Sequence, residues 1–349
     1  MKGVAAAIGH FIWREKIYIA LFAAVVFINL SLSFLSGFLR ESGLAERLEG
    51  SSQIFSGEAL KKAVETNPTA YFIFLYLAAA FVFFILVGII FDVVYFIMTK
   101  RGYVLVDATK RLEGARWNLW DICKVAIIFL FAQRVLWLID LFFISSVPFL
   151  HDKESLRLVF SATMADIIAI AALIYFVVDE RGEALDSLGL TARKMSINVR
   201  YGILAYVGLG PILVAVMMLT TTLFKKYNIP MEPQPVLVIL QSEKHVPSLV
   251  FMGLFTAVFG PVLEEVFFRG FAYGVFRRRL GIFWGIVASA FFFASIHGNL
   301  ASFFPILALG ITLTYLYEKT GSLVASITVH ILHNSISLAL LILLKGIAR

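Results

Sequence analysis

The sequence predicts an all-α fold, a polytopic bundle of eight or nine transmembrane helices. The chain has 349 residues, of which 60% are hydrophobic and only 15% are charged, against about 25% charged residues in soluble domains. Its mean hydropathy is +0.89. The apolar residues also gather in runs of about 20, the length that a helix needs to cross about 30 Å of hydrocarbon. We therefore expect an integral membrane protein.

Nine apolar runs meet or approach this length. In chain order they are 17–39, 70–98, 122–149, 158–178, 201–224, 249–276, 282–297, 303–317 and 323–344. The run 282–297 is short, so a count of eight spans stays open. The first run is too long for the apolar region of a signal peptide, and no small-residue cleavage pattern follows it, so we expect it to be retained. Polar connectors such as 41–68 and 99–121 separate the runs.

The charge distribution points to a membrane surface. Formal net charge is +7 and the sequence pI is near 9.4, but the basic residues lie in short clusters between apolar runs, which does not favour a nucleic-acid partner. The clusters after the second and sixth runs fall on the same side and favour a cytoplasmic N-terminus, hence a multi-pass protein of the plasma (inner) membrane. With Cys123 as its single cysteine, the chain has no internal disulfide.

Ionisable residues within the sixth run are the first candidates for chemistry, because each costs several kcal/mol at bilayer depth unless it is paired or hydrated. Glu264 and Glu265 are adjacent there, and Arg269 follows. At about 100° per residue, Glu265 and Arg269 share one helix face, whereas Glu264 points away. We expect Glu265 to form an orienting pair with Arg269 and Glu264 to be free as a general base. Pro261 should loosen this turn.

Two further runs carry imidazole and amide groups. His297 ends the seventh run, and His330 and Asn334 lie one turn apart in the ninth. A carboxylate and an imidazole that converge on one water can activate it for attack on a peptide carbonyl, and an amide can stabilise the oxyanion. The alternative is a zinc ion held by Glu264, His297 and His330, with water as the fourth ligand. No HExxH helix supports it, but both chemistries stay open.

The segments 264–270 (EExxFRG), 293–297 (FxxxH) and 330–334 (HxxxN) together resemble the three motifs of the CAAX protease and bacteriocin-processing (CPBP) family, also called Rce1-like or Abi proteins. The resemblance extends over about residues 199–345 and begins near Leu188-Gly189-Leu190. It implies an intramembrane endopeptidase. It also implies that Glu264 and His297 activate the water, that His330 and Asn334 complete the site and position the oxyanion, and that Glu265 and Arg269 support them. We favour the glutamate mechanism, which requires no cofactor, with zinc as the alternative.

On this basis residues 181–349 are predicted to form the protease domain, with core motifs in 261–334. Residues 1–180 are an N-terminal transmembrane region of unknown role with about four spans. The expected partners are the lipid bilayer and a membrane-associated peptide or protein substrate, whether prenylated, bacteriocin-like or neither. No nucleic acid is expected.

Two other classes of function stay open. One is a proton-coupled transporter that uses the buried carboxylates as a relay, which the absence of a visible internal repeat disfavours. The other is a catalytically silent membrane scaffold or adaptor, which the intact motifs disfavour. For His333, beside the third motif, a packing role is the preferred interpretation. Arg134 with Asp166 is a candidate structural pair between the third and fourth runs.

Overall fold

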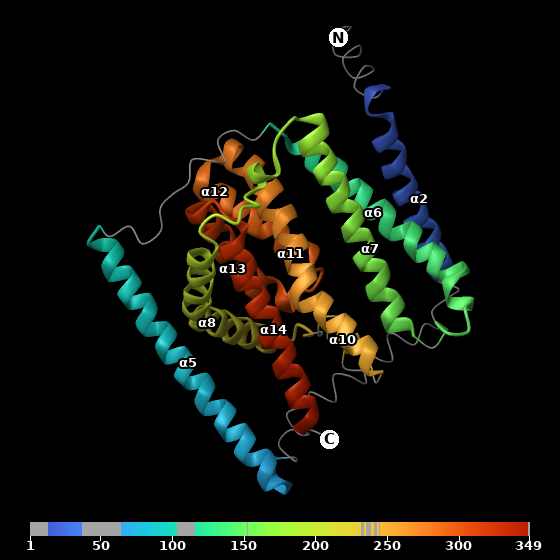
Figure 1. Cartoon of the computed structure of the whole chain (residues 1–349). Helices are drawn as coiled ribbons and strands as arrows, with labels where there is room; N and C mark the ends of the chain where they lie inside the picture. The colour runs from blue at the N-terminus through green and yellow to red at the C-terminus, as the bar shows by residue number, and fades with distance from the viewer. Residues whose placement is uncertain are drawn as a thin grey trace. The chain divides into compact units, whose positions relative to one another are not determined.

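The fold is described from a computed structural model of the chain. It covers residues 13–36, 64–102, 116–151, 153–231 and 245–347, together with residues 234, 239, 240 and 243. Throughout these ranges the regular secondary structure is helical and contains no strand (Figure 1). The predicted all-α fold class is therefore confirmed.

The α-helices follow the apolar runs in order. They are α2 (Lys16–Ser36), α5 (Pro68–Lys100), α6 (Leu119–Phe142), α7 (Glu154–Tyr175), α8 (Met195–Lys226), α10 (Val246–Leu254), α11 (Gly260–Glu265), α12 (Tyr273–Ile296), α13 (Leu300–Thr320) and α14 (Leu323–Ile347). Short 3₁₀ or π-helical segments extend or join them: η2 (Ile144–Ser146), η3 (Phe176–Glu180), η4 (Leu185–Leu188), η5 (Phe255–Phe259) and η6 (Val266–Ala272).

Seven helical stretches in the described residues are long and apolar enough to cross a membrane, and Lys16–Ser31 is a shorter apolar helix. The stretch Val246–Ile296 has 51 residues, which at about 1.5 Å per residue is far longer than a bilayer is thick. It is interrupted at Gly281, which has φ 76° and ψ 178°, and it covers both the sixth and the seventh predicted spans. The polytopic helical architecture is thus confirmed, and the seven stretches are roughly consistent with the predicted eight or nine spans.

Asparagine side chains set the first turn of several helices. Asn67 accepts hydrogen bonds from the backbone N–H groups of Thr69 and Ala70 at the start of α5. Asn299 caps α13 in the same way. These short polar side chains satisfy N–H groups that have no partner within the helix. The polar positions between apolar runs are therefore helix starts as well as connectors.

The described helices pack as two compact units. One contains α2, α6 and α7, and the other contains α5, α8 and α10 to α14. The second predicted span, α5, thus packs with the C-terminal helices, although it lies within the N-terminal region 1–180. The domain boundary near residue 180 stays a prediction.

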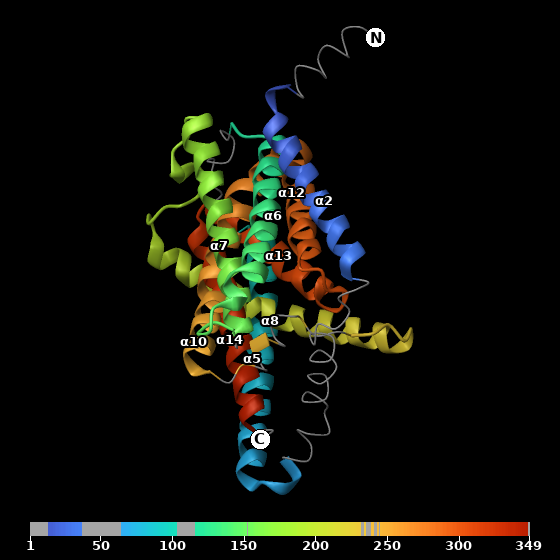
Figure 2. The same cartoon turned by 90° about the vertical axis from the view of Figure 1, so that its right-hand side faces the viewer.

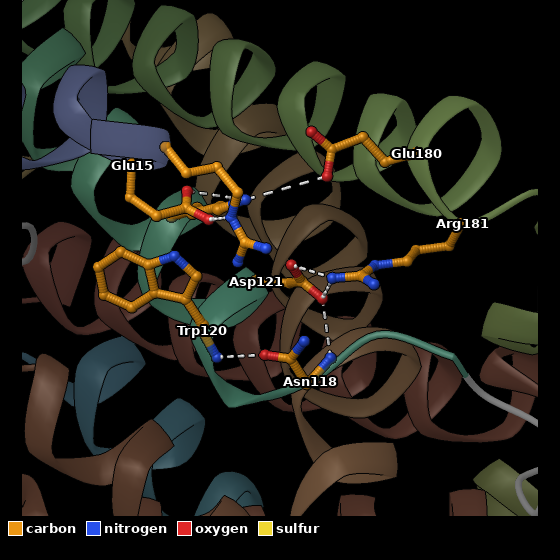
Figure 3. A network of polar contacts seen from close by, with 8 residues as sticks. Glu15, Asn118, Trp120, Asp121, Glu180 and Arg181 are labelled. Carbon is orange, nitrogen blue, oxygen red and sulfur yellow. Dashed lines mark hydrogen bonds and ion pairs between the residues drawn. The ribbon is translucent and has the colours of Figure 1, made fainter. Parts of the chain in front are cut away.

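In the first unit, a polar network joins the starts of α2 and α6 to the end of α7 (Figure 3). Lys124 lies 3.3 Å from Glu15 and 4.0 Å from Glu180. Asp121 is fully buried and accepts from Arg181 Nη2 with both carboxylate oxygens at 2.7 Å. Three helix ends are therefore held together by charges that are largely shielded from solvent.

The far end of this unit has its own ion pair. Arg157, near the start of α7, donates to Asp140 in α6 at 2.8 Å and to the carbonyl oxygen of His151 at 2.7 Å. Asp140 of α6 is therefore paired with Arg157 of α7. The pairing of Arg134 with Asp166 stays a prediction.

In the second unit, α8 runs across the direction of α13 and α14 (Figure 2). Its contacts are close because glycines lie where helices meet. A Cβ on Gly88 of α5 would come within 2.5 Å of the Val207 carbonyl oxygen of α8, and a Cβ on Gly202 of α8 within 2.7 Å of the Ala325 carbonyl oxygen of α14. A core of aliphatic side chains from α8, α13 and α14 fills the centre: Leu209, Leu213, Leu309, Leu313, Leu316, Ala325 and Val329. This packing holds α14, and hence His330, in place.

The first unit should lose stability in acid through Glu15, which precedes the apolar run. Burial by itself raises the pKa of the Glu15 carboxyl, but side-chain hydrogen bonds from Trp120, Arg14 and Lys124 hold that pKa below its ordinary value. A lowered folded-state pKa means that the carboxylate stabilises the fold above the unfolded-state value, and that this contribution is lost as pH falls through the folded-state value.

We therefore expect Glu15→Gln to lower the thermal unfolding midpoint in detergent by a few degrees at neutral pH. The difference from wild type should shrink below about pH 4.5. Asp179→Asn, which removes an exposed carboxylate at the same end of the unit, is the control and should leave the midpoint unchanged. A constant difference at all pH values would contradict the assignment.

Candidate active site

The carboxylates project from a helix whose hydrogen-bonding pattern changes twice. From α10 the chain passes through the π-helical segment η5, the short helix α11 and the second π-helical segment η6 before α12 begins. Pro261 lies in the first turn of α11, directly after η5, where a loosened turn was expected. π-Helical turns insert an extra residue and are frequent at functional sites. Glu264 and Glu265 therefore lie on one short helical stretch between two widened ones.

Glu265 is the acceptor at the centre of a buried charge cluster. Its Oε1 accepts from Arg269 Nη1 at 2.7 Å and contacts His330 Nδ1 at 2.9 Å. Glu265 and Arg269 are fully buried and His330 is 2% exposed. Since a carboxylate oxygen only accepts, His330 carries a proton on Nδ1, which leaves Nε2 as the free end of the ring. The ion pair expected between Glu265 and Arg269 is present, and it also orients an imidazole from α14.

Glu264 is turned to a more open position. Its side chain is 36% exposed, and its Oε2 lies 3.7 Å from His330 Nε2. This distance is longer than a direct hydrogen bond, so the two groups are neighbours without being bonded. The two adjacent glutamates thus flank the same imidazole from its two nitrogens. Glu265 is buried and its Oε1 is already hydrogen-bonded, whereas Glu264 is accessible.

His297 lies at the end of α12, and its ring packs against Phe293. His297 Nδ1 donates to the Phe293 carbonyl oxygen at 2.8 Å, because a carbonyl can only accept. The two rings meet edge to face with centroids 4.8 Å apart. Nδ1 is thus occupied, and Nε2 is the nitrogen that can act as a base. The imidazole that lies beside Glu264 in the structure is His330, and the predicted pairing of Glu264 with His297 stays a prediction.

Phe293 is the side chain around which the three motifs gather. It is 1% exposed, its ring lies 4.3 Å from the Arg269 guanidinium, and its centroid is 5.7 Å from that of His330. Each motif therefore contributes a side chain that touches this ring. The sequence gives one sign of this role, because Phe293 precedes His297 by one helical turn. The contact of Phe293 with Arg269 was not predicted from the sequence.

Asn334 is engaged with the backbone of η5. Its amide Nδ2 donates to the carbonyl oxygen of Thr256 at 2.9 Å. One of its two amide hydrogens is thereby occupied. The oxyanion role predicted for Asn334 would have to use the other. This contact between α14 and η5 was not predicted from the sequence.

Zinc would require Glu264, His297 and His330 to converge on one point. Among the residues that the structure describes, no group of three or more His, Cys, Asp or Glu side chains is arranged to hold a metal ion. His330 directs its two nitrogens to the two glutamates, and His297 packs on Phe293. The described geometry does not fit this ligand set, and metal dependence stays a prediction that chelation tests.

The short loop before α8 that contains Leu188 and Gly189 packs against the motif EExxFRG (residues 264–270). A Cβ on Gly270 would come within 2.9 Å of the Leu188 carbonyl oxygen. That oxygen also accepts from the Tyr317 hydroxyl at 3.0 Å. The next carbonyl, of Gly189, accepts the N–H of Leu323 at 3.0 Å, where α14 begins. The loop therefore braces η6 and the first turn of α14, the two segments that carry Arg269 and lead to His330.

The three motifs thus meet in the second unit, around Glu265, His330 and Phe293. Residues 246–336 match the family model described as Type II CAAX prenyl endopeptidase Rce1-like. This Rce1-like segment contains all three motifs, and the resemblance predicted from them is confirmed over it. The match is shorter than the predicted resemblance, which extended over about residues 199–345.

Two curated relatives match part of the chain. The chain is 26% identical over 90 residues to YdiL of Bacillus subtilis (strain 168), which is named as a candidate membrane peptidase; the aligned part is 26% of this chain and 37% of YdiL. It is 35% identical over 100 residues to the UPF0177 protein YaiF of Lactococcus lactis subsp. lactis (strain IL1403), over 28% of this chain and 44% of YaiF.

The chain therefore spans about two fifths of the length of the curated relatives it matches. No solved structure matches it. The family match and the apolar helices together identify an integral membrane protein with an Rce1-like segment.

Breaking the buried pair should strongly destabilise the second unit. Arg269→Met leaves the Glu265 carboxylate without its main counter-charge in a buried position, and losing one partner of such a pair costs about 3–5 kcal/mol. The free energy of unfolding in detergent should fall by about that amount, measured by denaturant titration. Arg279→Met, which removes an exposed cation from α12, is the control and should change stability by less than about 0.5 kcal/mol. Equal effects of the two substitutions would show that the pair contributes little.

Proposed function

We propose that the protein is an intramembrane endopeptidase that hydrolyses a peptide bond of a membrane-associated substrate. The attacking water is activated by Glu264 together with His297. The observation that carries this proposal is the placement of His330 between two glutamates. One glutamate is buried and paired with Arg269, and the other is 36% exposed and 3.7 Å from His330 Nε2. The match to a family described as Type II CAAX prenyl endopeptidase Rce1-like supports it.

The geometry gives each carboxylate a separate role. Glu265 is fully buried and its Oε1 accepts from Arg269 and from His330 Nδ1, so its task is to hold the imidazole in one tautomer and one orientation. Glu264 has no such partner at hydrogen-bond distance in the described contacts and is accessible, so it can meet a water molecule. This arrangement of a reacting group, an imidazole and an orienting acid is the general pattern of activated hydrolysis.

The reaction follows from these positions. Glu264 takes a proton from water as the water oxygen attacks the carbonyl carbon of the scissile peptide bond. The negative charge that develops on the carbonyl oxygen is stabilised by hydrogen-bond donors, for which Asn334 and His330 are the predicted groups; His330 can donate from Nε2 only as an imidazolium, because its Nδ1 proton is engaged by Glu265. When the carbon–nitrogen bond breaks, Glu264 returns the proton to the leaving amine. His297 is predicted to share the activation of water with Glu264.

The surroundings of the site support one substrate class. The site residues belong to helices apolar enough to span a membrane, so the substrate is a peptide or protein that is itself membrane-associated. Whether it is prenylated, bacteriocin-like or neither is part of the test. We place the protein in the plasma (inner) membrane with a cytoplasmic N-terminus, as the basic clusters predict. The preferred mechanism requires no cofactor.

The proposal is tested by cleavage of membrane-tethered peptides in liposomes. Glu264→Gln keeps the size of the side chain but removes the base, and general acid–base catalysis is worth about 10²–10⁴ in rate. We expect kcat/KM to fall at least about 100-fold for a substrate that wild type cleaves. Glu183→Gln, which removes a carboxylate near the surface outside the site, is the matched control and should cleave like wild type.

The same assay separates the two chemistries. In the glutamate mechanism a zinc chelator leaves cleavage unchanged. Loss of cleavage on chelation with recovery on added zinc would replace that mechanism by the metal one. Full activity of Glu264→Gln would remove Glu264 from the role of base. A wild-type protein that cleaves no member of a broad library of anchored peptides would overturn the proposed activity itself.

A further inference from the structure

The π-helical segment η5 leaves one backbone carbonyl without a helical partner. In this segment the Gly260 N–H bonds to the Phe255 carbonyl oxygen, five residues back. In the same register, the next carbonyl, of Thr256, would receive the N–H of residue 261. Residue 261 is proline, which has no N–H. The widened turn and the proline together therefore deprive Thr256 of its donor.

Asn334 supplies the missing donor from another helix. Its amide Nδ2 lies 2.9 Å from the Thr256 carbonyl oxygen. Inside a membrane-spanning segment an unsatisfied backbone carbonyl is costly, because neither lipid nor distant solvent can bond to it. The Asn334 side chain thus satisfies a carbonyl that the widened turn and Pro261 leave unpaired. We call the continuous helical stretch of α10, η5, α11 and η6 the carboxylate helix.

This hydrogen bond is one of the polar links between α14 and the helical stretch that carries Glu264 and Glu265. A second is the contact of His330 Nδ1 with Glu265 Oε1 at 2.9 Å. On α14 the two linking residues lie one turn apart. The packing of α14 on α8 and α13 holds the helix in place, and the two links add a direct constraint on its register with the turn that carries Glu264. The position of His330 relative to Glu264 depends on this alignment.

We propose that Asn334 is a positioning residue whose side-chain amide replaces the N–H that Pro261 lacks, and so holds the turn that carries Glu264 in register with His330. This contact uses one amide hydrogen of Asn334, and the oxyanion role predicted for the other is the alternative that the experiment below distinguishes. The inference rests on the proposed endopeptidase function for its activity readout, and on the packing of α14 against η5 for its structural readout.

A proline substitution provides the test. Asn334→Ala leaves the Thr256 carbonyl unsatisfied, and we expect kcat to fall by about 100-fold, the order of loss that a misplacement of about 1 Å produces. Pro261→Ala provides a backbone N–H at position 261 that can bond to Thr256 directly. In the double variant Pro261→Ala/Asn334→Ala, kcat should recover to within about threefold of Pro261→Ala alone. The control is Pro305→Ala/Asn334→Ala, which changes a proline inside α13 and should show no recovery.

Amide hydrogen exchange of the segment 255–265, followed by mass spectrometry, gives a readout that needs no activity. We expect faster exchange in Asn334→Ala and protection restored in the double variant with Pro261→Ala but not in that with Pro305→Ala. If protection recovers while kcat stays low, Asn334 acts on the substrate, and the positioning role is overturned. If neither recovers, the Thr256 contact is not what Asn334 provides. If wild type has no peptidase activity, the proposed function fails, but the exchange data still decide the structural claim.

Discussion

A charge buried inside a membrane protein must be paired, and the second unit is organised around one such pair. Arg269 and Glu265 are both fully buried and lie 2.7 Å apart. Neither could be accommodated alone, because removing an ion from water costs far more than a marginal fold can supply. The pair in turn fixes its surroundings: Glu265 binds His330, the Arg269 guanidinium lies over Phe293, and Gly270 admits the backbone of Leu188. The loop with Leu188 and Gly189, α12 and α14 are therefore all positioned against the same two charges.

The consequence for chemistry is a division between a buried half and an accessible half of the site. Glu265 is fully buried and its Oε1 already bonds to Arg269 and His330, so it is poorly placed to take a proton from a water molecule. Glu264, the preceding residue, lies on the other side of the His330 ring, 3.7 Å from its Nε2, and keeps a side chain that is 36% exposed. Adjacent carboxylates on one helix thus acquire different environments from rotation alone, about 100° per residue. The π-helical segments on either side allow α11 to present both residues toward α14.

The sequence predicted those features that depend on local periodicity or on polarity in an apolar run. The i,i+4 spacing of Glu265 and Arg269 was sufficient to predict their ion pair, and the length of the apolar runs was sufficient for the helices. It did not predict which imidazole lies beside Glu264, because His297 and His330 come from different helices and their approach depends on packing. The contact of Asn334 with Thr256 was equally hidden, since it follows from a change of helical register that no periodic pattern reveals. The packing of α5 against α8 depends on the absence of side chains at Gly88 and Gly208. A periodic pattern does not predict where two helices approach this closely.

Pro261 and Asn334 form a complementary pair in this site. Pro261 widens the turn ahead of the carboxylates but leaves the Thr256 carbonyl open, and an unsatisfied carbonyl in a membrane-spanning helix destabilises the fold. A side chain from α14 can bond to it only if α14 lies at one height and one rotation relative to the carboxylate helix. The defect in one helix therefore becomes a constraint on its neighbour. Since His330 lies one turn before Asn334 on α14, satisfying a backbone carbonyl and orienting the imidazole toward Glu264 become one structural requirement.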